Sequence, residues 1–459
     1  MAASHRQLGL RLQRLRQRHG LTQAELARQL AMSPSYLNQI ERNQRPLTLA
    51  VQQRLKAALG DIEGLLETDD PAALVEPLED SLRALGHTAV TPSELRMLAG
   101  NLPQVAHALL ELHRQHRHLQ ERAAALELRI GNERATALVL SPGDHVRDYF
   151  NRLRNYIPEL DERAEALYAE LDLSPETLAS RLRQRLTEHH GLRVRQDAQL
   201  GDKRLLDTDT QTLWLPTHLK PGQQSFQMAA QLALLKHGAL IDTLIARAGF
   251  DDAERIALAR IGLSNYYAGA LVMPYGAFLR SAEESHYDIE WLAQRFGVGF
   301  EAVCHRLSTL QRRNAAGLPF FFMRVDRAGN VSKRHSSTDF HFSQLGGACP
   351  LWIVYEAFNQ PGRILSQVAR MPDGRQYFWI ARQVSSGPPG YGQPRKTFAV
   401  TLGCDLRHAE RLVYSRGLDL TGGNAVPIGP GCLTCERTDC LQRAFPALPR
   451  LVGPTPPRS

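Results

Sequence analysis

Two short, closely spaced helices with strong capping signals at residues 22–42 constrain this chain more than any other feature. In LTQAELARQLAMS, Thr22 precedes a helical pattern and Glu25 follows three residues later, which is a capping box. In SPSYLNQIERN, Ser33 is a good N-cap and Pro34 takes the first helical position. The pattern predicts two helices joined by a few residues, within a small helical bundle. The apolar residues at helical spacing are Leu26, Leu30, Leu37 and Ile40.

Positive charge is concentrated in the part of the chain that holds these helices. Residues 1–60 contain ten Lys or Arg against two acids, an excess of 8 that equals the formal net charge of the whole chain, +8. Residues 61–100 are acidic, with nine Asp or Glu against two Arg. A basic head on a nearly neutral body favours a polyanion as the partner of the head. The alternative is a solvated helical face without a partner.

The second helix of the pair presents polar side chains on the face opposite its apolar residues. Asn and Gln can read base edges in pairs of hydrogen bonds, while Ser, Tyr and Arg can hold phosphates. Backbone N–H groups at the start of the first helix, near Gln23, also favour a phosphate. The candidate DNA-contacting residues are therefore Gln23, Ser33, Ser35, Tyr36, Asn38, Gln39, Arg42 and Arg45.

The stretch SPSYLNQIERNQRPLT closely resembles the Xre (Cro/CI-type) helix-turn-helix family. The resemblance implies that residues 5–62 form a domain that binds double-stranded operator DNA. The alternative for the same pattern is a helical bundle that binds protein. One such domain covers a single half-site, so DNA binding usually needs a homodimer or a higher homo-oligomer.

A long helix predicted to begin at Pro103 carries an apolar seam suited to pairing with a second copy. The spacing along this seam is 4-3-4-3-4-3-4, which predicts a coiled-coil-like dimerisation helix over residues 103–144. Its members are Val105, Leu109, Leu112, His116, Leu119, Ala123, Leu126 and Ile130. The His residues of this helix suggest a metal site as an alternative, although no nearby Cys or carboxylate cluster completes one.

Residues 145–318 show helical patterns, then short β-like pieces and a long helix, SFQMAAQLALLKHGALIDTLIA. This order resembles the zincin-like domain of the IrrE-type metallopeptidases, which is often fused to Xre heads. In those enzymes the helix carries His-Glu-x-x-His, whose two His bind zinc and whose Glu polarises water. The matching positions here are Ala230, Gln231 and Leu234, which supply neither zinc ligands nor a base. We therefore expect a degenerate domain without catalytic residues, in a chain that is not an enzyme, and we expect His237 to pack or face solvent.

Three thiols near the C-terminus, Cys432-x2-Cys435-x4-Cys440, have the spacing of metal ligands. An x2 gap lets two thiolates reach one centre from a tight turn, and a third follows four residues later. A fourth ligand has to come from elsewhere; Cys404 in LGCDL is the first choice and Cys349 in GACP the second. Tetrahedral zinc and a [4Fe–4S] cluster both accept four thiolates, and the spacing leaves both open, with unligated thiols as a third possibility.

Four segments, GGACPLWIVYEAF, QPGRILSQVARMPDG, LGCDLRHAERLVYSRGLDL and CLTCERTDCLQRAFP, together resemble the C-terminal module of the short-chain fatty acyl-CoA regulators. The resemblance implies a transcriptional regulator that senses an acyl-CoA, such as propionyl- or acetyl-CoA, and controls short-chain fatty acid catabolism. It also favours an iron–sulfur cluster over zinc at the thiols. Cations available for the phosphates of coenzyme A, with ordinary surface charge as the alternative, are Arg363, Arg370, Arg382, Arg407 and His408.

Two other functions remain open from the sequence. An iron–sulfur transcription factor that senses redox state would use the thiols as its effector site and need no acyl-CoA. A metallopeptidase that acts on a repressor is less favoured, because the zinc-binding positions are occupied by Ala, Gln and Leu.

We expect a multidomain α+β protein. Its parts are an all-α helix-turn-helix head (5–62), an acidic linker or helical region (63–102), a long helical connector (103–144), a zincin-like α+β middle (145–318) and a small β-containing, Cys-rich C-terminal module (319–459). The chain has no run of 18 apolar residues and no signal-like first segment, and its six Cys do not make a secreted disulfide scaffold. These features predict a cytoplasmic protein without a membrane partner.

Overall fold

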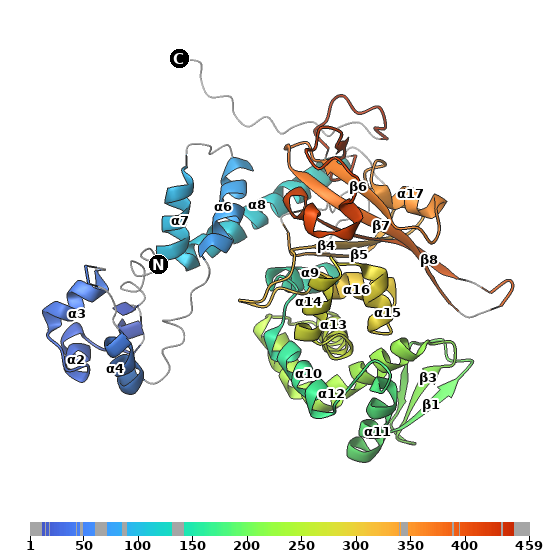
Figure 1. The fold of residues 1–459 in the computed structure, drawn as a ribbon, viewed down its shortest axis with the longest axis horizontal. Coiled ribbons are helices and arrows are strands. Elements are labelled where there is room, and N and C mark those ends of the chain that lie inside the picture. Colours follow the sequence, from blue (N-terminus) through green and yellow to red (C-terminus); the bar gives the residue numbers. More distant parts are fainter. Residues whose placement is uncertain are drawn as a thin grey trace. The chain divides into compact units, whose positions relative to one another are not determined.

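The structure, a computed structural model, describes most of residues 12–444. Outside the description lie residues 1–11, 60–70, 85–89, 131–141, 341–347 and 445–459, and the positions 14, 18, 43, 46–48, 339, 388–389, 394 and 433–434. The chain divides into two compact units, residues 1–122 and 123–459, and each is described by itself. Figure 1 shows the elements with their labels.

The described part of the first unit starts with helical residues 12–13 and 15–17. The two capped helices, α2 (Gln23–Gln29) and α3 (Pro34–Glu41), come next, followed by α4 (Leu49–Leu59). Both expected caps are present, the capping box before α2 and the Ser33 cap before α3. Between the helices, Ala31 adopts a left-handed conformation with φ of 49°, which turns the chain sharply. The expected helix-turn-helix bundle is confirmed, around a core formed by Leu12, Leu26, Ala27, Leu30, Leu37, Ile40, Val51 and Leu55.

In its described residues, the acidic stretch that follows forms the helices α6 (Pro71–Ala84) and α7 (Pro92–Asn101), and it leads into the long helix α8 (Pro103–Ile130). A second capping box, formed by Thr91 and Glu94, starts α7. These helices share a small core of their own, made of Leu74, Leu78, Leu95, Ala99 and Ala106. In α8 the side chains of residues 117, 118 and 120–130 lie outside the description.

The second unit opens with three helices and a three-stranded sheet. The helices are α9 (Pro142–Arg152), α10 (Pro158–Glu170) and α11 (Leu178–His190), and the strands are β1 (Arg193–Asp197), β2 (Leu205–Asp207) and β3 (Thr212–Pro216). The sheet order is β1-β3-β2, with β1 parallel and β2 antiparallel to β3.

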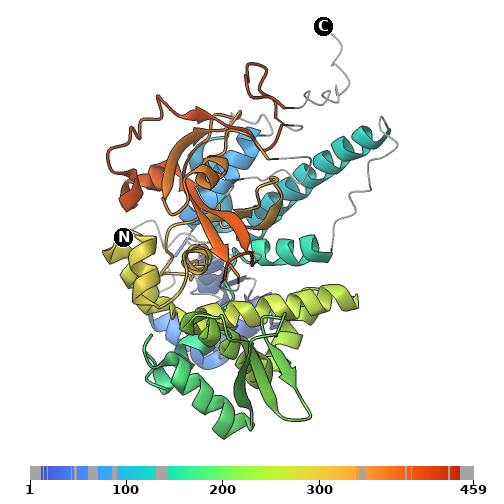
Figure 2. The same ribbon diagram turned by 90° about the vertical axis from the view of Figure 1, so that its right-hand side faces the viewer.

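Five more helices complete the α-helical part of this unit, in which α12 and α13 pack along each other (Figures 1 and 2). Helix α12 is long and apolar enough to span a membrane, but half of its most apolar window is buried inside the protein, as in the core helix of a soluble fold. The helices are α12 (Pro221–Arg247), α13 (Ala253–Val272), α14 (Tyr275–Glu284), α15 (Ile289–Arg295) and α16 (Phe300–Leu307).

The C-terminal part is built on a six-stranded sheet with the order β5-β4-β8-β7-β6-β9. A helix, α17 (Ile353–Asn359), and two short 3-10 helices, η2 (Leu406–Arg411) and η3 (Val413–Ser415), accompany it. The sheet is mostly antiparallel, and only the short β9 pairs in parallel with β6. The strands are β4 (Phe321–Val325), β5 (Val331–Ser336), β6 (Leu365–Arg370), β7 (Gln376–Ser386), β8 (Lys396–Asp405) and β9 (Val426–Pro427).

The two faces of this sheet belong to different cores, because neighbouring residues of a strand point to opposite sides. On one face Phe322, Phe378 and Leu402 join the core of the preceding helices. On the other face Phe321 and Trp379 pack with Cys349, Trp352 and Ile428. The helices and the sheet therefore share one continuous hydrophobic core across residue 318, where the sequence suggested a domain boundary. The fold class, a multidomain α+β protein, is confirmed.

Candidate nucleic-acid interface and candidate metal centre

The residues predicted to contact DNA lie on or beside α3, at the surface of the head. Helix α3 begins where the backbone N–H of Tyr36 donates to Ser33 Oγ at 3.1 Å. The guanidinium of Arg45 lies 5.8 Å from the centre of the Tyr36 ring. The exposed members are Ser33, Ser35, Arg42 and Arg45, and the half-buried ones are Gln23, Tyr36, Asn38 and Gln39.

An ion pair that sequence reasoning missed links α3 to the segment before α2. Glu41, in the last turn of α3, is 6% exposed and accepts hydrogen bonds from Arg16 Nε at 2.7 Å and from Gln23 Nε2 at 2.9 Å. Its hydrogen bond raises the pKa of Arg16. The side-chain amide of Gln23 is therefore engaged inside the head, so that its backbone N–H, and not its side-chain donor, is the group free to meet a phosphate. The feature of the sequence that could have indicated this ion pair is Glu41 itself, an acidic residue in an otherwise basic segment.

The predicted seam of α8 is exposed in its described half. The side chains of Val105, Leu109, Leu112 and Leu119 are 43%, 38%, 62% and 62% exposed. His116, at a seam position, is exposed as well. The remaining seam side chains, Ala123, Leu126 and Ile130, lie outside the described residues. An apolar stripe of this length on a single helix leaves a face suited to a second helix.

Four thiols border one small cavity, of about 10 Å³. They are Cys349, before α17, and Cys432, Cys435 and Cys440, after β9. Cys349, Cys432 and Cys435 are buried, while Cys440 is half-buried. Burial raises the pKa of the Cys349 thiol, and the charges of its neighbours Cys432 and Cys435 act in the same direction.

Cys404, the preferred fourth ligand in the sequence analysis, is not part of this cluster. It lies in β8 opposite Phe378, fully buried in the core that the sheet shares with the helices. Cys349 belongs to the core on the other face of the sheet. The sheet thus separates Cys404 from the other thiols, and the order of preference is corrected: Cys349 replaces Cys404. Sequence spacing could not show this, because it does not tell which face of a strand a side chain occupies.

Gly429 allows two of the sulfur atoms to approach the same point. Its backbone N–H donates to Cys349 Sγ at 3.3 Å, and its carbonyl accepts a hydrogen bond from Trp352 Nε1 at 3.0 Å. A Cβ at this position would lie 2.5 Å from Cys435 Sγ. Any other residue would therefore displace the Cys435 thiol from the cluster.

Two arginines hold the thiol-bearing segment in shape. Arg443 donates from Nη1 to the carbonyl of Cys432 at 3.1 Å and from Nη2 to the carbonyl of Cys435 at 2.8 Å, and it also reaches the carbonyl of Arg437. Arg437 donates to the carbonyl of Ile428 at 3.1 Å and to that of Arg370, in β6, at 2.7 Å. The segment is therefore fastened to itself and to the sheet by guanidinium groups.

The donor set suits a metal centre, although the thiols need a small movement to bind one. In the described part of the chain, no three His, Cys, Asp or Glu side chains are placed to hold a metal ion as they stand. Four thiols around one cavity match the ligand number of zinc and of iron–sulfur clusters, and neighbouring guanidinium groups offset thiolate charge.

The positions in α12 that carry the zinc ligands in metallopeptidases are packed in the hydrophobic core of the second unit. Ala230 and Gln231 are 0% and 6% exposed, and Leu234 is partly buried against the same core. The structure thus places a packed helix where a peptidase has its metal. His237, one turn further on, is half-buried, and its ring packs at a tilt against Tyr267, with the ring centres 5.0 Å apart.

The five cations considered for coenzyme A phosphates are spread over different elements, and each already has a protein partner. Arg363 donates to Gln360, and Arg370 in β6 reaches the carbonyl of Gly422. Arg382 in β7 pairs with Glu290 at 2.8 Å. Arg407 and His408, both in η2, contact each other at 3.3 Å. Their positions do not single out a phosphate site.

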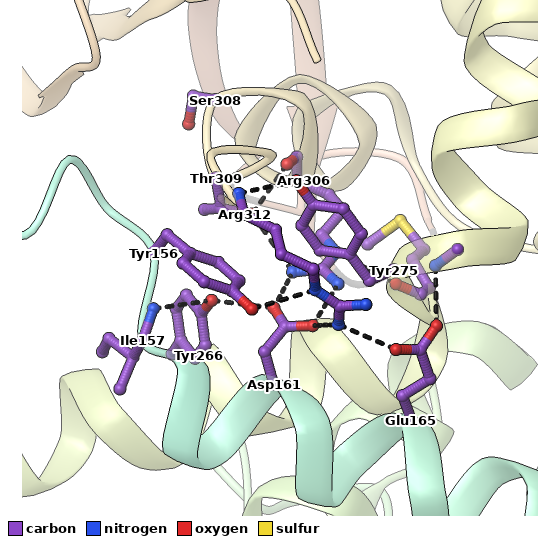
Figure 3. A network of polar contacts seen from close by, with 12 residues as sticks. Tyr156, Ile157, Asp161, Glu165, Tyr266, Tyr275, Arg306, Ser308, Thr309 and Arg312 are labelled. Carbon is purple, nitrogen blue, oxygen red and sulfur yellow. Dashed lines mark hydrogen bonds and ion pairs between the residues drawn. The ribbon is translucent and has the colours of Figure 1, made fainter. Parts of the chain in front are cut away.

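A buried polar network joins the helices to the segment that enters the sheet (Figure 3). Asp161 in α10 accepts hydrogen bonds from Arg306 in α16 and from the Tyr266 hydroxyl in α13. Arg312 extends the network to Glu165 at 2.7 Å and to the Tyr156 hydroxyl at 3.0 Å. Each of these groups has a partner inside the network, which suits a structural role.

Comparison with known protein families matches three regions of the chain. Residues 7–60 match the helix-turn-helix domain family, and residues 187–308 match the IrrE N-terminal-like domain. Residues 309–456 match the family described as short-chain fatty acyl coenzyme A regulator, C-terminal.

Curated relatives resemble the chain over nearly its whole length. The HTH-type transcriptional regulator RamB of Mycobacterium tuberculosis is 48% identical over 96% of this chain and 95% of its own. The HTH-type transcriptional regulator PrpR of the same organism is 46% identical over 96% of this chain and 92% of its own. The propionyl-CoA carboxylase regulator of Cereibacter sphaeroides is 40% identical over 98% of this chain and 96% of its own.

A solved structure of a Mycobacterium tuberculosis transcriptional regulator is 50% identical, with a TM-score of 0.65, over 67% of this chain and 94% of that chain. The relatives are named as regulators rather than peptidases, in keeping with the packed positions in α12. The helix-turn-helix head, with α3 exposed at its surface, is the part that binds DNA. The chain belongs to the family of short-chain fatty acyl coenzyme A regulators and is a DNA-binding transcriptional regulator, not an enzyme.

Proposed function

We propose that this regulator senses a short-chain acyl-CoA, such as propionyl- or acetyl-CoA, and that the ligand changes its affinity for operator DNA. The observation that carries the proposal is the combination, in one chain, of a helix-turn-helix match at 7–60 and an acyl-CoA regulator match at 309–456. A ligand can do this only by binding two conformations unequally. The region matched at 309–456 shares a continuous hydrophobic core with the helices of the same unit, so a ligand bound in this unit can act on both.

The test is a titration of operator binding with propionyl-CoA. A labelled duplex from the regulator's own upstream region is incubated with the full-length protein, and its affinity is measured with propionyl-CoA, acetyl-CoA or free coenzyme A. We expect the acyl-CoA to change the affinity about fivefold or more, the lower end of ordinary coupling between sites. Equal affinities with and without every acyl-CoA would refute the acyl-CoA proposal and leave DNA binding intact.

We also infer that the protein acts as a homodimer paired through α8. The exposed apolar residues of α8 recur at coiled-coil spacing, and operator recognition by a helix-turn-helix usually joins two half-sites. Leu112→Glu, which places a charge in the stripe, should shift the protein to monomers in light scattering and weaken operator binding. Glu111→Gln, at the neighbouring position outside the stripe, is the matched control and should remain dimeric.

The thiol cluster is proposed as a metal centre held by Cys349, Cys432, Cys435 and Cys440. Its supports are the number of thiols around one cavity, the ligand spacing and the close approach that Gly429 permits. An iron–sulfur cluster (4Fe–4S) is the leading occupant on the resemblance described above, and zinc is the alternative. Bound metal would link the segment after β9 to the turn before α17 and so stabilise this end of the sheet.

A second candidate function, redox sensing, is favoured by one observation: these thiols lie next to the sheet that shares its core with the helices. If the centre is an iron–sulfur cluster, its loss in air should alter operator affinity without any acyl-CoA. The discriminating measurement is operator affinity of anaerobically purified and air-exposed protein, each with and without propionyl-CoA. A response to air alone favours the redox sensor, and a response to acyl-CoA alone favours the leading proposal.

A further inference from the structure

Two strands of the C-terminal sheet continue beyond their neighbours as a two-stranded ribbon. Strand β6 pairs with β7 only as far as Ala381, and β4 pairs with β8 only from Ala399 onward, whereas β7 and β8 stay paired to the outer end of both strands. Residues 382–386 and 396–398 therefore form a ribbon that has no third strand among the described residues (Figure 1). A two-stranded ribbon is only marginally stable by itself, so other contacts have to hold it.

Contacts with two helices and with a neighbouring strand supply this support. Arg382, on the ribbon, pairs with Glu290 in α15 at 2.8 Å, and its guanidinium lies 5.3 Å from the centre of the Phe300 ring in α16. From β4, the guanidinium of Arg324 lies 4.3 Å from the centre of the Phe398 ring. The ribbon is therefore held in place before any partner binds.

Four cations from four segments of the second unit meet at the base of the ribbon. They are Lys203, between β1 and β2, Arg324 in β4, Lys333 in β5 and Lys396 in β8, and we call them the basic cluster. Arg324 and Lys333 stand directly opposite each other in the sheet. Glu301 in α16 bridges these two, at 3.0 Å from Arg324 and 2.9 Å from Lys333.

The basic cluster carries more positive charge than this acid neutralises. The charged groups that act on Lys203 are the other three cations of the cluster and Glu301. Partial burial of its amino group, and next the charges of Lys333 and Arg324, lower the pKa of Lys203, although the residue as a whole is exposed. Lys203 and Lys396 are both exposed and form no ion pair within the described residues. Like charges held together in this way repel one another, and an anion from outside the chain would relieve the repulsion.

The wider surroundings of the ribbon favour a polyanion. Residues 319–459 contain 17 Lys or Arg against nine Asp or Glu, an excess of 8 that is as large as the excess in the head. Beyond the paired strands, Arg395 and Tyr391 are exposed. Lys and Arg are the residues that hold phosphates in protein–DNA interfaces, and a two-stranded ribbon fits the major groove of a duplex.

We propose that the ribbon and the basic cluster bind the phosphate backbone of double-stranded DNA outside the base pairs that α3 reads. The head binds DNA, and the covalent link to the head keeps the second unit close to the same duplex, which raises the effective concentration of phosphate around the cluster. Phosphates carry no sequence information, so this contact adds affinity without sequence preference. The inference rests on DNA binding by the head and not on acyl-CoA sensing.

The test compares two operator duplexes in the full-length protein. One is trimmed by footprinting to the base pairs that the head protects, and the other carries about two further helical turns, about 20 base pairs, of arbitrary sequence on each side. The test variant combines Lys203→Gln with Lys396→Gln, because these exposed cations have no ion pair to lose. The control combines Arg363→Gln with Arg416→Gln, which removes the same charge from exposed positions elsewhere in the second unit.

Affinities are measured by fluorescence anisotropy at several salt concentrations, under the acyl-CoA condition that gives the tighter operator binding. We expect wild type to bind the extended duplex about tenfold more tightly than the trimmed one, with a steeper dependence on salt. The test variant should lose this gain, and its slope of log affinity against log salt on the extended duplex should fall by about two, one for each phosphate contact removed. Its melting temperature should equal or exceed that of wild type, because mutual repulsion is removed.

The control separates a local contact from general charge. A gain that the test variant loses and the control keeps supports the proposal. If the extension adds nothing to wild-type affinity, or if the control loses as much as the test variant, the proposal is overturned. A third measurement, the melting temperature with inorganic phosphate in place of chloride, identifies a small anion as the occupant. If phosphate raises this temperature in wild type but not in the test variant, and the extension adds nothing, the cluster holds a free anion and the DNA contact is overturned.

Discussion

Arg306 and Asp161 form a bidentate ion pair that is almost completely withdrawn from solvent. Arg306 Nη1 and Nη2 lie 2.7 and 3.1 Å from the two Asp161 oxygens, and the side chains are 2% and 0% exposed. Arg306 Nε also donates to the carbonyl of Met273 at 2.9 Å. Burial acts to lower the pKa of Arg306, but the charge and hydrogen bonds of Asp161 more than compensate and raise it. The pair fastens α10 to α16 at the point where the chain leaves the helices for the sheet.

Asp161→Asn should therefore destabilise the second unit strongly. The substitution keeps the size of the side chain but leaves the Arg306 guanidinium buried without a counter-charge, which typically costs about 3–5 kcal/mol. Urea unfolding followed by far-UV circular dichroism measures the change. The matched control is Arg411→Gln, which breaks an exposed pair with Glu283 and should cost less than about 0.5 kcal/mol. Equal effects of the two substitutions would contradict the assigned role of the buried pair.

The parts of the structure that follow from local sequence rules were predictable, and those that depend on which residues meet in space were not. Thr22 with Glu25, and Ser33 with Pro34, determine helix starts within three or four residues, and both caps occur as expected. The helix-turn-helix could therefore be predicted from the sequence in detail. The spacing of Cys432, Cys435 and Cys440 likewise predicted that these three thiols lie close together, and all three border one cavity.

The fourth thiol and the buried ion pairs depend on long-range pairing. Cys404 and Cys349 could each supply a fourth thiol as far as the sequence shows. Only the register of β8 places Cys404 on the face away from the cluster. Asp161 and Arg306 are 145 residues apart, and neither stands in a motif. No spacing rule connects such residues, since their contact is set by how α10, α13 and α16 pack.

Substitutions in α3 should separate base reading from phosphate contact. Gln39→Ala removes an amide suited to base edges and should weaken operator binding by about 1–3 kcal/mol while leaving binding to random duplex unchanged. Arg42→Ala should weaken binding to both duplexes and reduce the slope of log affinity against log salt by about one. Fluorescence anisotropy at several salt concentrations measures both. Gln29→Ala, on an exposed position of α2, is the control; a drop as large as that of Gln39→Ala would contradict the reading role of α3.

Cys→Ser variants should identify the fourth ligand of the proposed metal centre. Cys349→Ser should lower the metal content of anaerobically purified protein, because Cys349 borders the cavity with the other three thiols. Cys404→Ser should retain wild-type metal content, although a polar hydroxyl in the core destabilises the fold somewhat. Elemental analysis for iron and zinc, with the visible spectrum, measures both variants. Metal lost from Cys404→Ser but kept by Cys349→Ser would restore the sequence-based order.

Stability should fall as the pH decreases from about 6.5 to about 4, in part through His305. Its ring lies 4.8 Å from that of His335 and 5.7 Å from that of Phe322. Burial, and next the charge of Lys333, lowers its pKa to about 4. The unfolded chain takes up this proton near pH 6.5, so between the two values it binds more protons than the folded protein. The stability that the neutral His305 ring contributes is fully present above about pH 6.5. At lower pH it decreases by up to about 1.4 kcal/mol per pH unit.

The check is the free energy of unfolding of wild type and His305→Gln at pH 7, 6 and 5. The variant loses packing at every pH, but its deficit should shrink as the pH falls, because it lacks the titrating ring. His218→Gln, on an exposed position, should follow the wild-type curve. Parallel curves for wild type and His305→Gln would show that this ring is not protonated more readily in the unfolded chain.

Arg443→Gln should weaken metal retention without removing a ligand. The guanidinium holds the carbonyls of Cys432 and Cys435, so that the thiol segment is shaped before any metal binds. Replacing a group that orients a metal ligand typically changes the affinity for the metal about 10- to 100-fold. A chelator competition, which compares the rate of metal loss in wild type and variant, measures the effect. Arg416→Gln, on an exposed position outside the cluster, is the matched control. Equal rates for wild type and Arg443→Gln would mean that metal binding alone shapes the segment; a faster loss, with four thiols still present, would mean that the guanidinium shapes it first.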